Sequence, residues 1–282
     1  MPKNIKKLTI LHSNDMHGDF LPKYSGERRI GGAAMLSGYI DKVRGEEENV
    51  LYVISGDTFR GSLIDSEYKG VSTIEILNML APDCMTLGNH EVDYGVAHML
   101  FVEKCSNFPI INANLYITTN NVRLFRSHVI LNVGGMRILI IGVLTDEVLT
   151  LTRQDRLIGS FINSGEAAAE IGKICTQYRG VDIDLTIILT HIGFDEDKKL
   201  AEKLDPAWGV DCIIGGHSHS LMDKPCVVSG IPIVQAGCGT AQLGRFDMYV
   251  NTDTDDIDSY EWRCVPLEGY PENEKLSALI SR

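Results

Sequence analysis

The feature that most constrains the fold of this sequence is a regular alternation of short apolar runs with segments of helical spacing. The runs are rich in Ile, Val and Leu, which predicts buried strands. An alternation of such strands with helices is typical of an α/β domain. The expected strands are 7–15, 49–57, 84–89, 109–115, 185–191, 210–219, 231–237, 244–253 and 259–267, and the expected helices are 30–48, 71–80, 95–105, 164–179 and 196–204.

A hairpin signal interrupts the alternation in the middle of the chain. Residues 127–144 form two apolar runs around Gly134–Gly135, a dipeptide typical of a tight turn between antiparallel strands. No linker, low-complexity run or internal repeat divides the sequence. The sequence therefore predicts one compact α/β domain with mixed sheets.

Length, net charge and cysteine content indicate which kinds of binding partner and cellular location to expect for this protein. The chain has 282 residues, enough for one large domain or two ordinary ones. Its net charge of −12 argues against binding to polymeric nucleic acid, which needs a basic surface. No apolar stretch is long enough for a signal peptide or a membrane span, so we expect a cytoplasmic protein with no membrane partner. Seven cysteines without a Cys-x-x-Cys pair predict reduced, mostly buried thiols.

Five of the expected strands end in residues that commonly bind metal ions. Because ligands of α/β folds bind beyond the carboxyl ends of the strands, we expect these ends to converge on one site. Seven donors of imidazole, carboxylate and amide type are too many for one ion but suit two divalent ions bridged by a carboxylate. Such pairs of ions are used for displacement at phosphorus. The candidate donors are Asp15, His17, Asp57, Asn89, His191, His217 and His219.

Each of these motifs has an ordinary explanation when it is taken alone. An Asp-x-His triplet is common, a Gly-Asp pair after a strand usually makes a turn, and a Gly-His-Ser-His run is compatible with a polar loop. The ordered set, with every member at a strand end, favours a metal centre over these explanations. Five of the eight histidines belong to the set, and we interpret His12, His98 and His128 as core or surface residues.

Taken together, these residues resemble a known family, the calcineurin-like dinuclear metallophosphatases. The similarity is closest to the branch of 5'-nucleotidases, UDP-sugar hydrolases and 2',3'-cyclic nucleotide phosphodiesterases, and it covers nearly the whole chain. It is carried by the segments NDMHG, GDTFRGS, MTLGNHEVDYG, LTHIGFDEDKKLA, DCIIGGHSH, GGAAMLSGYIDKVR and VQAGCGTAQLGRFDMYV. The resemblance implies a metallophosphatase domain over residues 1–270, with two facing mixed β-sheets flanked by helices in a four-layer α/β sandwich.

The resemblance also implies which donors would share an ion. One ion would be held by Asp15, His17 and His219. The other would be held by Asn89, His191 and His217, and Asp57 would bridge the two. The ions would be Mn, Fe, Zn or Co, and a water or hydroxide that they hold would attack phosphorus.

The same resemblance implies that His90 stays off the metals and faces the substrate phosphate. Asp93 would orient its imidazole, since a carboxylate partner raises the pKa of a histidine and fixes its ring. Arg60 is either a weak candidate for contacting substrate phosphate, beside Asn89 and His90, or an ordinary surface arginine.

Members of this branch usually carry a second, C-terminal domain that binds the nucleoside. The present sequence ends at Arg282, so we expect residues 271–282 to be a tail where that domain would begin, and the domain itself to be absent. Three functions stay open. They are hydrolysis of phosphoesters of small molecules, nucleotides among them; hydrolysis of phosphodiesters or cyclic nucleotides at the same site; and a non-catalytic, metal-stabilised binding or scaffold subunit.

Overall fold

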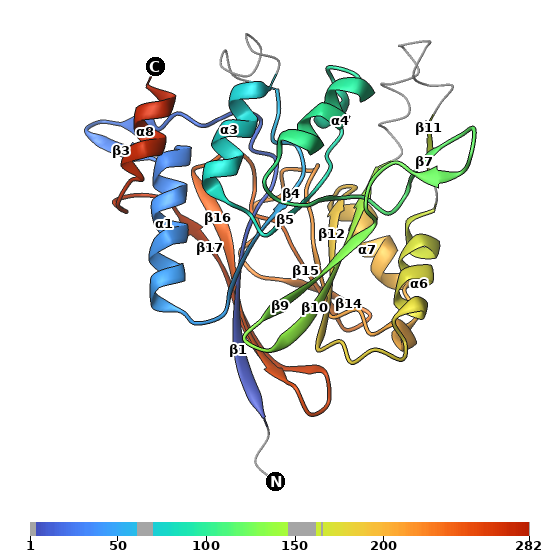
Figure 1. The fold of residues 1–282 in the computed structure, drawn as a ribbon. Coiled ribbons are helices and arrows are strands. Elements are labelled where there is room, and N and C mark those ends of the chain that lie inside the picture. Colours follow the sequence, from blue (N-terminus) through green and yellow to red (C-terminus); the bar gives the residue numbers. More distant parts are fainter. Residues whose placement is uncertain (1–3, 61–69, 146–161, 165, 282) are drawn as a thin grey trace.

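Two six-stranded mixed β-sheets face each other in the computed structural model of the protein, which describes residues 4–60, 70–145, 162–164 and 166–281 (Figure 1). In the first sheet, β1, β4, β5 and β6 run parallel. At one side of them, β16 pairs antiparallel with β1, and β17 pairs antiparallel with β16. The order of its strands is β17 (Asp256–Pro266), β16 (Gln242–Asn251), β1 (Ile5–Ser13), β4 (Val50–Ser55), β5 (Cys84–Thr86) and β6 (Ile110–Ile111).

The second sheet also contains four parallel strands, but its two remaining strands lie at opposite edges. Its inner strands β15, β13, β12 and β10 run parallel, and an antiparallel strand closes each edge. The carboxyl ends of the parallel strands therefore lie along one edge of each sheet. The strand order is β14 (Cys226–Val228), β15 (Ile231–Val234), β13 (Cys212–Ile214), β12 (Leu185–His191), β10 (Met136–Leu144) and β9 (His128–Val133).

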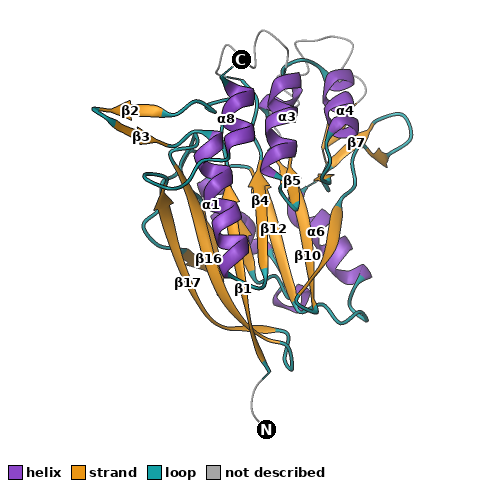
Figure 2. Cartoon of the chain, turned by 60° about the vertical axis from the view of Figure 1, so that its left-hand side comes forward, coloured by secondary structure: helices purple, strands orange, loops and turns teal. Residues whose placement is uncertain are grey.

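Helices cover the outer face of each sheet, which gives four layers (Figures 1 and 2). The first sheet is covered by α1 (Ala33–Glu46), α3 (Val71–Leu80), α4 (Val96–Cys105) and α8 (Glu274–Ile280), and the second by α6 (Ala167–Gln177) and α7 (Phe194–Lys203). Short elements lie in the connections: β2 (Lys23–Ser25), β3 (Arg28–Ile30), β7 (Leu115–Ile117), β8 (Val122–Arg123), β11 (Ile162–Ser164), η1 (His90–Val92) and η2 (Pro206–Trp208). The predicted four-layer α/β sandwich is confirmed. In the described part of the chain, no helix is both long and apolar enough to span a bilayer.

Three apolar cores fill the spaces between the four layers. In β12, Ile187 and Leu189 point into the core between the sheets, whereas Ile188 points into the core under α6 and α7. Successive residues of a strand point to opposite faces, so each strand contributes to two cores. Because both faces are buried, the strands appear in the sequence as continuous apolar runs.

Most of the predicted elements are present, and α3 and β12 have the predicted bounds. The hairpin around Gly134–Gly135 is also present, as β9 and β10. The predicted strand 210–219 is wrong beyond Ile214, where β13 ends and a polar loop begins. The predicted strand 109–115 is too long, because the chain leaves the first sheet after Ile111.

All seven cysteines are free thiols, but the prediction that most are buried is wrong. Cys84, Cys175 and Cys212 are buried, Cys105 and Cys238 are exposed, and the other two are intermediate. The exposed pair lies at the end of α4 and in the loop after β15, outside the strands that form the cores.

The C-terminal segment folds back onto α1. Asn273 donates its backbone N–H to the carbonyl of Ala34 and its side-chain amide to the hydroxyl of Ser37, and its Oδ1 caps the first turn of α8. Gly38 lets the chain approach closely, since a Cβ there would lie 1.9 Å from the carbonyl oxygen of Pro271. Residues 271–281 therefore pack against the same helical layer, and the predicted boundary at residue 270 stays a prediction.

Candidate metal centre

The loops that carry the predicted donors meet where the parallel strands of both sheets end. From the first sheet, the loops after β1, β4 and β5 supply Asp15, His17, Asp57 and Asn89. From the second sheet, the end of β12 and the loop after β13 supply His191, His217 and His219. The structure brings all seven side chains together in two groups that draw residues from both sheets. A third group, His17, Asp57 and His90, shares a residue with each of them.

One group consists of Asp15, His17 and His219. Nε2 of His219 lies 2.9 Å from Nε2 of His17 and 3.4 Å from Oδ1 of Asp15. The ligand atoms all lie within 4.8 Å of one another, close enough to share one ion. Asp15 is fully buried, and its Oδ2 accepts from the amide of Asn14 (2.6 Å) and from the N–H of His217 (2.9 Å).

The second group consists of Asp57, His191 and His217, with the amide of Asn89 between them. Nε2 of His191 lies 3.1 Å from Oδ2 of Asp57 and 3.1 Å from Oδ1 of Asn89. Nδ1 of His217 lies 2.8 Å from the same Asn89 oxygen. The carbonyl of Ser55 lies 2.8 Å from Nδ1 of His191, which places the proton of the neutral ring there and turns Nε2 to the centre.

Asp57 belongs to the second group and also lies close to the first. Its Oδ2 is 3.1 Å from His191 and 4.0 Å from Nε2 of His17, a member of the other group. Its Oδ1 accepts the backbone N–H of His90 at 2.9 Å, which fixes the carboxylate. One carboxylate within reach of both groups is the arrangement that a bridged pair of ions requires.

Backbone strain concentrates at these donors. Five of them have a left-handed backbone, with φ of 51° at Asp15, 49° at His17, 52° at Asp57, 78° at His217 and 52° at His219. Residues other than glycine rarely adopt this conformation, which costs on the order of 1–3 kcal/mol each. Strain of this kind is typical of sites where side-chain direction matters more than stability.

The loops after β4 and β5 touch at Gly88. A Cβ at this position would lie 2.2 Å from both the backbone nitrogen and Oδ1 of Asp57. Only a residue without a side chain allows so close an approach, so Gly88 sets the distance between Asp57 and the following Asn89.

The carboxylates make the centre attractive to positive charge. Burial alone would lower the pKa of His191, but the charge of Asp57 overrides it and raises that pKa to about 9. In the opposite direction, His191 outweighs the effect of burial and lowers the pKa of Asp57 to about 2. A divalent cation would therefore displace a proton from His191 on binding.

His90 and Asp93 form a pair beside the centre. Nδ1 of His90 lies 2.8 Å from Oδ2 of Asp93, and Nε2 lies 4.0 Å from Oδ2 of Asp57. The same Asp93 oxygen accepts from the guanidinium of Arg60 at 3.1 Å. Asp93 thus orients the imidazole, and Arg60 holds Asp93. A contact of Arg60 with substrate phosphate stays a prediction.

Glu91 has a role that the sequence motifs did not specify. Its buried carboxylate accepts from the N–H of Asp57 (3.0 Å), the N–H and hydroxyl of Thr58 (2.7 and 2.9 Å) and the N–H of Gly88. Burial, and then the charge of Asp57, raise the pKa of Glu91. Glu91 therefore ties the loop of Asp57 to the loop of Asn89.

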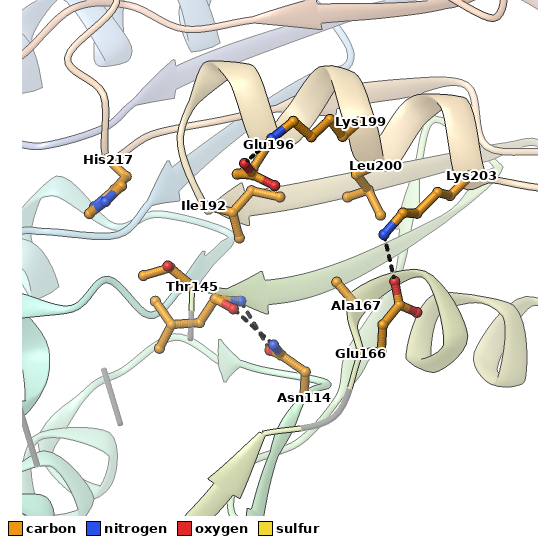
Figure 3. A pocket seen from close by; sticks show the side chains of 11 residues that line it. Asn114, Thr145, Glu166, Ala167, Ile192, Glu196, Lys199, Leu200, Lys203 and His217 are labelled. Carbon is orange, nitrogen blue, oxygen red and sulfur yellow. Dashed lines mark hydrogen bonds and ion pairs between the residues drawn. The ribbon is translucent and has the colours of Figure 1, made fainter. Parts of the chain in front are cut away.

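A cleft of about 420 Å³ adjoins the centre at His217 (Figure 3). Leu144, Ile192 and Leu200 contribute apolar surface to it. Across it, Lys203 of α7 points to Glu166 at the start of α6, with 3.4 Å between Nζ and Oε1. The cleft therefore offers both apolar and charged contacts next to the metal-binding side chains.

The residues of the centre fit two divalent ions. Imidazole, carboxylate and amide donors together suit Mn, Fe, Co or Zn. Within the described residues, the ion pairs of Asp15 and Asp57 are with histidines alone. Two buried carboxylates are costly without a permanent positive charge beside them, and two cations would supply it.

Comparisons with known proteins agree with this geometry. The calcineurin-like phosphoesterase family matches residues 8–221. Snake venom 5'-nucleotidase of Naja atra is 32% identical over 98% of this chain, an alignment that covers 56% of that protein. The solved 5'-nucleotidase precursor of Thermus thermophilus superposes with a TM-score of 0.87 at 26% identity, over 98% of this chain and 58% of the other.

A second solved structure shows the same fold. It is the calcineurin-like phosphoesterase YfkN of Bacillus subtilis, with a TM-score of 0.82 at 22% identity over 98% of this chain and 96% of the other. By contrast, the chain spans about half the length of the curated relatives it matches.

Proposed function

Because the chain belongs to the calcineurin-like phosphoesterase family, we propose that it hydrolyses phosphoesters of small molecules at a centre of two divalent metal ions. One observation carries the proposal. Asp57 lies within 4.0 Å of nitrogen donors from both groups, so a single carboxylate is placed to bridge two ions. A bridged pair of ions is a device for displacement at phosphorus.

The ions, when bound, would act as Lewis acids and lower the pKa of water at the centre. His90 would stay outside the donor set, with Nε2 turned to the centre and Nδ1 held by Asp93. It would donate a hydrogen bond or a proton to a phosphoryl or leaving oxygen, a contribution of roughly 10²–10⁴-fold. Asp93 would hold the ring in the orientation that this donation needs.

The experiment that tests this function is a metal-dependent hydrolysis assay. The purified chain is treated with a chelator, then supplied with Mn²⁺, Co²⁺ or Zn²⁺, and the release of p-nitrophenol from p-nitrophenyl phosphate is measured. We expect turnover that requires an added ion and that is lost in Asp57→Asn. A protein that binds both ions and releases no product under any of them would be a metal-stabilised scaffold subunit instead.

The same assay separates the two catalytic alternatives. Bis-p-nitrophenyl phosphate reports diesterase activity, and a 2',3'-cyclic nucleotide reports cyclic phosphodiesterase activity. We propose that phosphomonoesters are the preferred substrates. The reason is that relatives similar to this chain over about half of their length are named 5'-nucleotidases. Faster turnover of either diester than of the monoester would reverse that preference.

For the substrate, we propose small phosphorylated metabolites, nucleotides among them. The cleft beside His217 has room for the organic part of such a molecule, with apolar surface and charged side chains within reach. The test is a panel of nucleoside monophosphates and sugar phosphates, assayed with Mn²⁺ present. Similar kcat/KM values for all members would indicate that this chain alone does not discriminate between organic groups.

For the ions, we propose Mn, Fe, Zn or Co. Four of the seven donors are imidazoles, His17, His191, His217 and His219, and imidazole suits these metals better than it suits Mg²⁺ or Ca²⁺. Elemental analysis of the purified chain, followed by reconstitution with each metal, would identify which of them supports turnover.

A further inference from the structure

The end of β15 lies at the same edge as the metal centre but supplies no donor to it. β15 lies next to β13 and parallel to it, and Gln235 follows it directly. Gln235 is fully buried, yet it has no place in the proposed donor set. Its side chain lies instead behind the loop that carries His217 and His219.

The amide of Gln235 uses all of its hydrogen-bonding capacity on that loop and on one carboxylate. Its Nε2 donates to the carbonyl of Gly216 (3.1 Å) and to Oδ2 of Asp197 (3.0 Å). Its Oε1 accepts from the hydroxyl of Ser218 (3.0 Å) and from the N–H of Ser220 (3.3 Å). Three residues of the loop, one before His217 and one on each side of His219, are therefore held by a single side chain.

Asp197 orients this amide together with the carbonyl of Gly216 and the N–H of Ser220. It lies in α7, is fully buried, and its Oδ1 accepts from the hydroxyl of Thr190 at 2.6 Å. Burial raises the pKa of Asp197 to about 7, and in its ionised form its other oxygen can only accept. The NH₂ end of Gln235 then faces Asp197, at 3.0 Å, and the carbonyl end faces Ser218. Thr190 immediately precedes His191. The Asp197 carboxylate therefore also contacts the end of β12, which carries His191, another of the proposed metal donors.

We propose that Asp197 and Gln235 form a positioning unit for the metal centre, in which the carboxylate orients the amide and the amide fixes the loop of His217 and His219. The unit rests on the proposed metal-dependent function and extends it to two residues that touch neither ion nor substrate. The physical reason lies in the loop backbone. His217 and His219 both have a left-handed φ, and such a conformation persists only where the surroundings hold it in place.

A pair of amide and carboxylate exchanges tests the unit. In Asp197→Asn, the new amide keeps its contact with Gln235 only if its oxygen faces Nε2, and its NH₂ group then faces the hydroxyl of Thr190, which must accept instead of donate. In the opposite orientation the NH₂ groups of the new amide and of Gln235 oppose each other. In Gln235→Glu, two buried carboxylates face each other. The double variant Asp197→Asn with Gln235→Glu restores a complementary amide and carboxylate. It also keeps an acceptor for Ser218 and Ser220, although Gly216 loses its donor.

The measurement is calorimetric titration of the metal-free protein with MnCl₂, alongside the melting temperature without metal. We expect each single variant to weaken Mn²⁺ binding by about 10–100-fold, as the loss of groups that orient metal ligands typically does. The double variant should regain most of that loss. If Asp197 and Gln235 only stabilised the fold, the single variants would melt at a lower temperature. The double variant would then have no reason to regain Mn²⁺ affinity.

Asp184→Asn is the matched control. Asp184 is also buried, accepts the N–H of Arg137 at 2.7 Å, and precedes β12 at the end of the strand opposite His191. We expect it to lower the melting temperature without changing Mn²⁺ affinity. If the single variants fail to fold, Ser218→Ala, on an exposed loop residue, should still weaken Mn²⁺ binding.

The outcomes separate this inference from the function beneath it. Unchanged Mn²⁺ affinity in the folded single variants, or in Ser218→Ala, would overturn the positioning unit while the metal centre stands. A double variant that binds no better than the single variants would overturn it as well. A parent protein that binds no Mn²⁺, Co²⁺ or Zn²⁺ would overturn the metal centre itself.

Discussion

At the residue scale, the short stretch after β5 divides several tasks among neighbours. Gly88 allows the approach to Asp57, Asn89 faces the second group of donors, and His90 stands beside them. Glu91 turns the other way and holds the loop of Asp57. Adjacent side chains can do such different work because the tight turn of η1 sends them in different directions.

The first prediction concerns His90. His90→Asn removes the imidazole that faces the centre but none of the seven proposed donors. We therefore expect both ions to be retained and kcat on p-nitrophenyl phosphate to fall by roughly 10²–10⁴-fold. Metal content and steady-state rates measure the two effects. His128→Asn, on the outer strand β9, is the control and should leave kcat unchanged. Loss of one ion in His90→Asn would make His90 a ligand.

The second prediction concerns Glu91. Glu91→Gln replaces one accepting oxygen with an NH₂ group that faces N–H donors in a buried site. We expect the free energy of unfolding of the metal-free protein to fall by about 1–3 kcal/mol, the cost of leaving buried polar groups unsatisfied. Urea denaturation measures it, with the exposed Glu75→Gln as the control. Equal stability of the two variants would show that Glu91 does not hold the loops.

At the element scale, local patterns predicted the long elements well and the short ones poorly. β12 and α3 were predicted to the residue because an apolar run or a helical stripe marks each of them. The hairpin of β2 and β3 and the edge strand β14 were not predicted, since strands of three residues contain too little pattern. Their pairing depends on neighbours that are set by the topology.

The same limit applies to the candidate site. The meeting of the seven candidate donors could be predicted because each follows an apolar run that marks a strand end. The residues that hold them could not be, because their partners are distant in sequence: Glu91 and Thr58 are 33 positions apart, and Gln235 and Asp197 are 38. A buried glutamine or aspartate has no local signature that distinguishes it from an exposed one. Only the packed fold reveals these roles.

The third prediction tests how α8 is attached. In Gly38→Ala, the new methyl group would lie 1.9 Å from the carbonyl oxygen of Pro271, so the C-terminal segment must move. We expect a loss of roughly 1–3 kcal/mol, as for other overpacked sites, and faster tryptic cleavage at Lys275. Gly45→Ala, in the same helix with no atom within 4 Å, is the matched control. It should gain up to about 1 kcal/mol from helix propensity. Equal proteolysis of both variants would contradict the contact.

At the scale of the whole molecule, the two ends of the sandwich differ in their electrostatics. The carboxyl ends of the strands gather Asp15 and Asp57 around histidines. Near the start of β13, Asp211 is surrounded by less positive charge. Burial and the charges of Asp256 and Asp255 raise the pKa of Asp211 to about 7. The hydrogen bond that its carboxylate accepts from the N–H of Thr186 acts in the opposite direction, but it is too weak to cancel this rise.

The fourth prediction follows from that pKa. Between about pH 4 and pH 7, the folded protein keeps the Asp211 proton and the unfolded chain does not, so stability falls as the pH rises and the penalty is complete above pH 7. Asp211→Asn can still accept from Thr186 and carries no charge. We expect it to be more stable than the parent by roughly 1–2 kcal/mol at pH 8, since partial solvent access reduces the full effect, and equally stable at pH 4. The measurement is the melting temperature of the parent and of Asp211→Asn, in chelator, at pH 4 and at pH 8. Equal melting temperatures of the two proteins at pH 8 would contradict the prediction.

The last prediction is that bound metal holds the two sheets together. Each group of donors draws residues from both sheets: Asp15 and His17 with His219 in one, and Asp57 and Asn89 with His191 and His217 in the other. The unfolded chain does not keep these donors together, so metal binds the folded protein preferentially. At a free Mn²⁺ concentration 100 times the Kd of a site, each bound ion should add about 2.7 kcal/mol to the free energy of unfolding.

The measurement is the melting temperature as a function of Mn²⁺ concentration, with and without chelator. Asp57→Asn is the informative variant. Its new amide oxygen can still accept the backbone N–H of His90, but the negative charge that would bridge the two ions is lost. We expect the parent to gain several degrees and the variant to gain little. Equal gains in both proteins would mean that the ions bind without a bridging carboxylate, and the assignment of Asp57 as the shared ligand would fall.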